Sequence, residues 1–467
     1  MPEKSQLNGV IRRNVFASFA IKGVALVVAF LSTPAYIRYF DNDSVLGFWF
    51  TVVAVLNWLL FFDFGIGNGL RNHLGRAIVN KNAITAKRLV SSAYFVMGLI
   101  ALGTFVVGVL VFSIIDVVEM MSVDTSIVSR DVWFQVVLIV FGGVILHLWL
   151  KLISSVLNAL QKTALPSLVT LISNLLILIV LVWKPEISIA EKLVLLAATQ
   201  VASINVPLVV ISLIVFKRYL PNATPSIKYV GKNESKVVIY LGGAFFFIQL
   251  MLLFISSTNE LLITAFCNTA DVVYYSVYYR LFYLIVTMFG LFVQPLWSAL
   301  NYQYHSGNYD WMKKVHNRFV MAASVASILS FLLVIPLQTI IDIWLGSSSF
   351  GVEACAALAF ASLASTMLFV NSSTCIANAT SKLKPQIVTL AIGVLLRIPL
   401  CMLMLSLLGG HWASIVWSNV LCLLPCAIIQ LVATKKEFKT GILKPTNRED
   451  GFRLEENKTS NQEIGCL

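Results

Sequence analysis

Three basic side chains stand inside long apolar stretches of this sequence: Lys22, Arg280 and Arg397. A charged group is costly in hydrocarbon, so ionisable residues in such stretches usually face a water-filled cavity and serve a function. Three cations around one cavity would attract an anion, and guanidinium groups bind phosphate oxygens through paired hydrogen bonds. We therefore predict that these residues bind the phosphates of an anionic headgroup. Alternatively, Lys22 and Asp63 neutralise each other, and the two arginines bond helix carbonyls or extend to the membrane surface.

A glycine-rich segment follows Asp63 and reads Phe-Gly-Ile-Gly-Asn-Gly-Leu-Arg-Asn up to position 72. Because glycine recurs at every second position, we do not expect a close helix–helix seam of the GxxxG type. We expect a helix end that loosens, with Gly65 and Gly67 in a gate or hinge and Asp63 at the gate or in ion coupling. The alternative is a tight turn. No Lys-Ser or Lys-Thr follows the glycines, so a phosphate-binding loop is not expected.

The elements that must position these residues are membrane-spanning helices. The chain has 467 residues, of which 58% are hydrophobic and 12% charged, and its mean hydropathy is +0.85. A span needs about twenty apolar residues, and a helix satisfies its own backbone polar groups in lipid. The apolar stretches predict an all-α integral membrane protein of about twelve helices, near residues 15–37, 44–70, 89–115, 131–156, 164–183, 191–216, 237–259, 271–300, 319–343, 352–377, 386–408 and 411–433.

Basic residues alternate between the connections. They gather after the even-numbered spans and in the central loop, which is the positive-inside pattern and places both termini in the cytoplasm. We expect a cytoplasmic N-terminus at 1–14, a six-helix N-lobe at 15–216, a cytoplasmic central loop at 217–236, a six-helix C-lobe at 237–433 and a polar cytoplasmic tail at 434–467. Residues 71–88, which carry Arg71, Arg76, Lys81, Lys87 and Arg88, are assigned to a cytoplasmic loop.

A short internal repeat agrees with two lobes of the same topology. Asn-Ala-Leu-Gln-Lys at 158–162 and Asn-Ala-Thr-Ser-Lys at 378–382 each precede a proline, at 166 and 385. Proteins built from two such lobes bind their substrate between them and work by alternating access.

Several other classes of function are disfavoured. The net charge of +12 falls in short loops between spans, so membrane orientation explains it better than nucleic-acid binding. The seven cysteines form no CxxC motif, and neither a disulfide framework nor a metal site is expected. GxSxG, HExxH and Walker motifs are absent from the sequence, so we predict no catalytic residues, no cofactor and no enzyme activity.

Four stretches carry a resemblance to a known family. They are residues 61–72, Tyr-Tyr-Ser-Val at 274–277 with Arg-Leu at 280–281, Gln-Pro-Leu-Trp-Ser-Ala-Leu at 294–300 with Gly-Asn-Tyr at 307–309, and Ile-Trp-Leu-Gly at 343–346. In these stretches and its span count the chain resembles the O-antigen (Wzx-type) flippases, whose superfamily also holds the MATE drug extruders and the lipid II flippases.

The resemblance implies a MATE-like fold and transfer of an undecaprenyl-pyrophosphate-linked oligosaccharide from the cytoplasmic to the periplasmic leaflet of a bacterial inner membrane. It implies alternating access driven by an ion gradient, with a polysaccharide polymerase and chain-length proteins as possible partners. Two other functions stay open: a cation-coupled drug or metabolite exporter, and a non-transporting scaffold for polysaccharide assembly. Drug extruders often carry an acidic residue in the first span, where this chain has Lys22.

Overall fold

The computed structural model describes residues 64–114, 127–268, 271–345 and 351–440, and scattered residues between positions 17 and 53. Within these residues, ten helical segments are long and apolar enough to cross a membrane. The protein is therefore an all-α, multi-pass membrane protein, as the apolar stretches predict. Asp63, one of the predicted gate residues, lies outside the described residues.

The helices fall into two halves joined by a compact connection. The first half contains α3 (Ile66–Val79), α4 (Ala83–Ile114), α6 (Arg130–Leu150), α7 (Leu152–Ala159), α8 (Ala164–Trp183) and α9 (Ile189–Ile214). The connection contains the turns η1 (Val215–Tyr219), η2 (Pro221–Ala223) and η3 (Ile227–Tyr229). The second half contains α10 (Lys232–Ser257), α11 (Asn259–Phe266), α12 (Asp271–His305), α13 (Tyr309–Leu332), α14 (Leu337–Leu345), α15 (Ala354–Thr380), α16 (Lys384–Leu407) and α17 (Ala413–Thr440).

Several expected spans differ from the helices observed. Phe64 and Gly65 form a turn with positive φ angles of 49° and 64°, and α3 begins after it, so the expected loop at 71–88 is largely helical. The expected span at 319–343 is divided between α13 and α14, and Pro336, which has no N–H to donate, lies at the break. The last helix also continues beyond 433 to Thr440.

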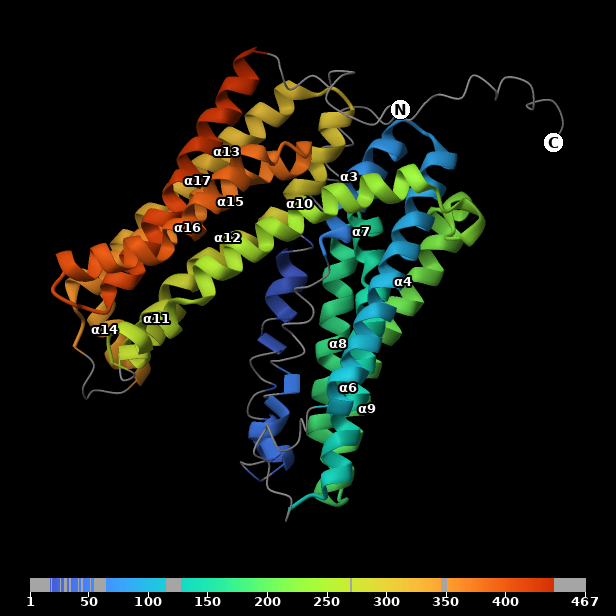
Figure 1. The fold of residues 1–467 in the computed structure, drawn as a ribbon, viewed down its shortest axis with the longest axis horizontal. Coiled ribbons are helices and arrows are strands. Elements are labelled where there is room, and N and C mark those ends of the chain that lie inside the picture. The colour runs from blue at the N-terminus through green and yellow to red at the C-terminus, as the bar shows by residue number, and fades with distance from the viewer. Residues whose placement is uncertain are drawn as a thin grey trace.

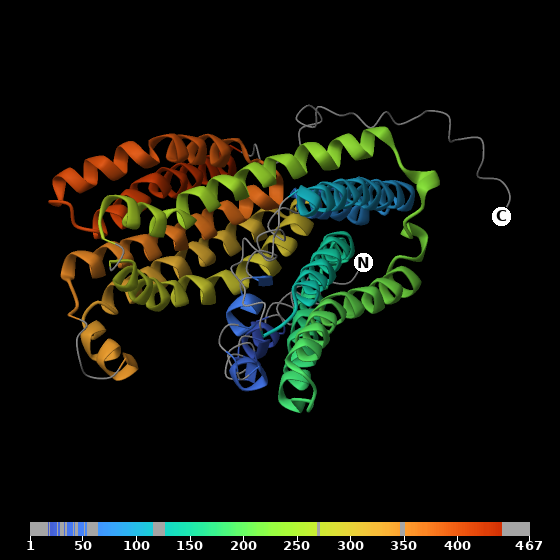
Figure 2. The ribbon, with the colours of Figure 1, turned by 60° about the horizontal axis from the view of Figure 1, so that its bottom comes forward.

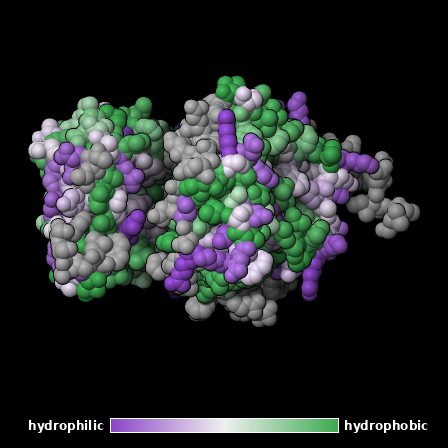
Figure 3. Space-filling model, turned by 90° about the horizontal axis from the view of Figure 1, so that it is seen from below, coloured by the Kyte–Doolittle hydropathy of each residue, from purple (hydrophilic) through white to green (hydrophobic). Residues whose placement is uncertain are grey.

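The two halves form bundles that meet at one end and diverge at the other, like the arms of a V (Figure 1). In the view of Figure 1, α3, α7 and the first part of α10 lie where the arms meet. Figure 2 shows the C-terminal bundle on one side and α4, α6, α8 and α9 on the other. Seen from the diverging end, the molecule has a furrow between two masses (Figure 3). We call the two ends of the V the joined end and the open end.

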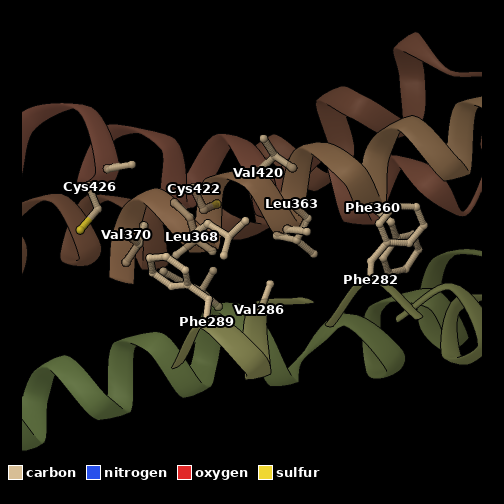
Figure 4. Close-up of a cluster of buried hydrophobic side chains, with 14 of the residues drawn as sticks. Phe282, Val286, Phe289, Phe360, Leu363, Leu368, Val370, Val420, Cys422 and Cys426 are labelled. Atoms are coloured by element: carbon tan, nitrogen blue, oxygen red, sulfur yellow. The ribbon is translucent and has the colours of Figure 1, made fainter. Parts of the chain in front are cut away.

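The C-terminal bundle is organised around α15 and α17. Figure 4 shows Phe282, Val286 and Phe289 of α12 directed toward side chains of these two helices, among them Phe360 and Val420. In α15, more than half of the most apolar 18-residue stretch is buried inside the protein, whereas in α4 the corresponding share is 17%. Lipid is as apolar as leucine, so close packing rather than exclusion from water holds such inner helices together. The closely packed inner helices therefore hold the side chains at the bundle surface in fixed positions.

The internal repeat is visible in the backbone. Gln161 and Ser381 occupy the same position of the repeat and both have φ of 61°. At each site the following lysine N–H returns to a carbonyl five residues earlier, from Lys162 to Leu157 and from Lys382 to Ala377. This is a helix end closed by a left-handed residue. The two halves thus repeat a local structure as well as a sequence pattern.

Candidate functional site between the bundles

The short helix α3 lies between the two bundles and contacts α10 and α12 of the second half as well as α4 and α7 of the first. Its glycines permit this position. A Cβ on Gly65 would lie 2.1 Å from the carbonyl oxygen of Gly242 in α10, and one on Gly69 would lie 2.7 Å from that of Val238. Gly65 and Gly69 are one turn apart, so they share a face. The expectation of no close seam is therefore wrong, because Gly69 of α3 and Gly65 just before it press against α10. The expectation of a loosened helix end is also wrong, since α3 is a regular helix from Ile66 to Val79, whereas the turn at Phe64 and Gly65 matches the alternative of a tight turn.

Gly67 faces the other way. A Cβ there would meet the Oγ of Ser155 in α7 at 2.5 Å, and a hydroxyl can rotate away from such a contact. The two predicted glycines thus have different neighbours. Gly65 contacts the second half of the chain and Gly67 contacts the first.

Arg71 of α3 is fully buried at the contact between the halves, with 1% of its surface exposed. Its Nη1 donates to Gln294 Oε1 at 2.7 Å, and its Nη2 donates to the Gln294 carbonyl at 2.7 Å and to Ser298 Oγ at 2.6 Å. The guanidinium carbon lies 4.1 Å from the ring centroid of Trp297, in a cation–π contact. All the acceptors described for Arg71 are uncharged and belong to α12, so this arginine ties the first half to the second.

Further hydrogen bonds at the same level join the halves. Asn72 Nδ2 donates to the Asn378 carbonyl at 2.6 Å and to Ser381 Oγ at 2.9 Å, while its Oδ1 accepts from Trp297 Nε1 at 3.1 Å. Gln161 Nε2 donates to the Ser298 carbonyl at 2.6 Å. We call this set the inter-bundle lock: Arg71, Asn72 and Gln161 of the first half with Gln294, Trp297, Ser298, Asn378 and Ser381 of the second.

Lys22 lies next to the lock, because the pocket that it lines also contains the lock residue Gln294. It lines a pocket of about 310 Å³ with residues of α8 and α12, including Asn174, Gln294 and Pro295. Phe19, one turn before Lys22, stacks on Phe292 of α12 with 4.8 Å between ring centroids. Lys22 is the charged member among the described lining residues, and the others are apolar or neutral polar groups. The pocket therefore offers a partly buried ammonium beside neutral hydrogen-bonding groups.

Arg280 lies on the face of α12 that lines the Lys22 pocket, but at a different height along the helix. Gln294 and Leu291 of this face line the Lys22 pocket. Arg280 precedes Gln294 by about four turns, or about 21 Å, and falls between the two in angle around the helix. Its side chain is exposed. Arg280 thus lies nearer the open end, on the helix face that the Lys22 pocket shares.

Arg397 is placed elsewhere. It is completely buried inside the C-terminal bundle. Its Nη1 donates to Ser418 Oγ at 2.6 Å and to the Ile415 carbonyl at 3.3 Å, and its Nη2 donates to Asn259 Oδ1. Asn259 in turn donates to the Tyr275 hydroxyl at 3.0 Å. These bonds join α16 to α17, α11 and α12. Neither Arg397 nor Arg280 is among the described residues that line the Lys22 pocket, so the structure does not bring the three cations together there.

Replacement of Arg397 by alanine is expected to destabilise the C-terminal bundle. It would leave Asn259 and Ser418 without their charged partner in a buried site, at a cost of about 3 kcal/mol or more. Thermal unfolding of the purified protein in detergent should show a clearly lower midpoint for Arg397→Ala. Arg280→Ala, which removes an exposed arginine, should unfold like the wild type. Equal midpoints for both variants would contradict the structural role of Arg397.

Sequence reasoning did not single out Arg71. Its position just after an apparent span assigns it to a basic loop, whereas the turn at Gly65 starts a new helix that carries it into the contact between the halves. One observation points toward it: an arginine within a glycine-rich segment, where small neighbours allow another helix to approach closely.

No protein-family model matches the chain, and no curated protein sequence matches it. Solved structures do. A MATE structure in complex with MaD3S is similar over 96% of this chain and 100% of its own, with 11% identity and a TM-score of 0.73. The Vibrio cholerae MATE transporter VcmN in its bent form matches over 95% and 100%, with 13% identity and a TM-score of 0.71. An outward-facing multidrug resistance MATE family transporter of the MOP superfamily matches over 96% and 99%, with 10% identity and a TM-score of 0.69.

The chain therefore has the fold of the MATE transporters, over nearly its full length. This confirms the predicted MATE-like, two-bundle architecture.

Proposed function

We propose that the protein is an alternating-access transporter held in an outward-facing state. The basic residues of the positive-inside pattern, such as those of η1 and of the first part of α13, lie at the joined end (Figure 1). That end is then cytoplasmic and the open end periplasmic. The inter-bundle lock closes the cytoplasmic side, and its residues must separate when the transporter faces inward.

We further propose that the substrate is an undecaprenyl-pyrophosphate-linked oligosaccharide, flipped from the cytoplasmic to the periplasmic leaflet. The observation that carries this proposal is the charge of the Lys22 pocket between the bundles. Its described lining residues include Lys22 and no acidic residue. Arg280 adds a second cation on the same face of α12. A site of this kind attracts phosphate and repels a cationic drug.

The alternative function is drug or metabolite export, which the MATE likeness supports equally well as a fold. A cation-coupled exporter of cationic compounds would need a carboxylate in the pocket or its gate, and Asp63 is the sequence candidate for it. A non-transporting scaffold would tolerate the loss of Lys22. The variant described next therefore separates the flippase from the scaffold and from the exporter, because neither of these needs Lys22 for polysaccharide output.

A strain that lacks the gene and is complemented with Lys22→Ala is expected to lose at least about nine-tenths of its surface polysaccharide. One charge-assisted hydrogen bond to phosphate contributes about 1.5–3 kcal/mol, which corresponds to a factor of ten or more in binding. Lys22→Arg should retain output, and Lys184→Ala, an exposed lysine at the open end, should be normal. Normal polymer from Lys22→Ala at wild-type membrane level would contradict the proposed binding role.

A further inference from the structure

A second and larger pocket lies on the other side of the lock. It has a volume of about 790 Å³ and is enclosed by α3, α10, the end of α12, the turn between α15 and α16, and α17. The lock residues Asn72 and Ser381 form part of its wall. The pocket is at the joined end, where the basic connections gather, and its volume is within the usual range for small-molecule sites.

One wall of this pocket is basic. Arg76, Lys382 and Lys384 line it together with His73 and His305, and among the described lining residues Glu437 is the acidic one. Helix α16 begins at Lys384, so its N-terminal end, with its partial positive charge, also faces the pocket. Three permanent cations against one carboxylate favour an anion, and phosphate matches this arrangement of donors.

Another part of the lining is apolar. Leu241 and Ala244 of α10 and Ile387 and Val388 of α16 line it, and these two helices contact each other. Val388 is 47% exposed and Tyr240, at the rim, is 81% exposed. A free phosphate would gain nothing from contact with these apolar side chains. An amphipathic ligand would contact both the basic and the apolar lining residues, with its phosphate among the cations and its hydrocarbon chain along α10 and α16.

We propose that this pocket binds the phosphate headgroup of an anionic lipid that enters from the cytoplasmic leaflet beside α10 and α16. This rests on the proposed function and deepens it, because the pocket becomes the loading site for the lipid-linked pyrophosphate. A headgroup bound there lies against Asn72 and Ser381, on the cytoplasmic face of the lock. Opening of the lock would then connect the loading site with the Lys22 pocket.

The test uses the full-length protein in detergent and farnesyl pyrophosphate as a short isoprenyl probe, with binding followed by native mass spectrometry or thermophoresis. The double variant Lys382→Ala/Lys384→Ala should bind the probe at least about tenfold more weakly than the wild type. The matched control is Lys313→Ala/Lys314→Ala, an exposed basic pair at the start of α13 that does not line the pocket. An equal loss in both variants, or no loss in the first, would overturn the proposal.

A second variant and two further probes keep the lipid and phosphate parts separate. Val388→Ser replaces an exposed apolar side chain of the lining with a small polar, uncharged one and should weaken binding with little cost to folding. Inorganic pyrophosphate and farnesol should each bind at least about tenfold more weakly than farnesyl pyrophosphate. Equal binding of inorganic pyrophosphate would overturn the lipid part in favour of a soluble phosphate compound. Equal binding of farnesol would overturn the phosphate part.

The failure of this site and the failure of the proposed function give different results. If lipid-linked oligosaccharide is flipped at the normal rate by Lys382→Ala/Lys384→Ala, the loading site is wrong and the flippase stands. If the wild type binds farnesyl pyrophosphate as predicted but flips no lipid-linked oligosaccharide, the flippase is wrong, and with it the loading role, while the lipid-headgroup site itself stands.

Discussion

Replacing Arg71 with alanine is expected to abolish transport and to release the outward-facing state. The arginine makes three hydrogen bonds of 2.6–2.7 Å to α12 and a cation–π contact with Trp297, all of them between the two halves. Hydrogen bonds of a charged donor contribute about 1.5–3 kcal/mol each. Loss of even two would shift the balance between states by about 3 kcal/mol or more, which is about a hundredfold in population.

The shift is measured between spin labels at the open end, on Glu186→Cys at the turn after α8 and Ser406→Cys near the end of α16, in a background without other cysteines. Arg71→Ala should shorten the distance between the labels as the bundles close at that end. Arg318→Ala, an exposed arginine at the joined end, is the matched control and should leave the distances unchanged. Unchanged distances in Arg71→Ala would show that the lock does not hold this state.

The second large effect is expected from Gly65→Ala. The methyl group would lie 2.1 Å from a backbone oxygen of Gly242, which cannot rotate away, and alanine would be strained at a φ of 64°. Backbone strain of this kind costs about 1–3 kcal/mol before the clash is counted. Helix α3 must therefore move away from α10 and take Arg71 with it. We expect severely reduced polysaccharide output together with a lower unfolding midpoint.

Two alanine variants calibrate this effect. Gly243→Ala, next to Gly242 on α10, meets no atom within 4 Å and should behave like the wild type. Gly67→Ala meets the Ser155 hydroxyl as its one close contact, at 2.5 Å, and should be mild because the hydroxyl can rotate away. Near-normal polysaccharide output from Gly65→Ala would contradict the predicted role of Gly65 in a gate. A loss from Gly67→Ala as large as that from Gly65→Ala would show that the contact with α10 is not what matters.

The architecture follows from the sequence because the membrane leaves few options. Apolar stretches of span length must be helices, and the repeated connections at 158–162 and 378–382 indicate two related halves. The predicted repeat is matched by equivalent left-handed residues at 161 and 381. The turn at Phe64 and Gly65 is not visible in hydropathy, since apolar residues continue through it. A single backbone conformation there decides that α3 is a separate helix.

The candidate site was only partly accessible from the sequence. Lys22 and Arg280 are found by the cost of a charge in a span, and both lie on the side of α12 that lines the pocket between the bundles. Arg397 meets the same criterion, but its charge is used inside one bundle, and helix periodicity cannot distinguish an inward face from a cavity face. Arg71 escapes the criterion because it follows the apolar run, and only the packing of α3 shows that it is buried.

The most direct test of the flippase proposal uses the purified protein in liposomes that contain a fluorescent, isoprenyl-pyrophosphate-linked oligosaccharide. A reagent that destroys the fluorescence of the outer leaflet reports transfer between leaflets when an ion gradient is applied. The proposal predicts transfer by the wild type, at least about tenfold slower transfer by Lys22→Ala, and no gradient-driven uptake of a cationic dye such as ethidium. Dye uptake without lipid transfer would contradict it and identify a drug exporter.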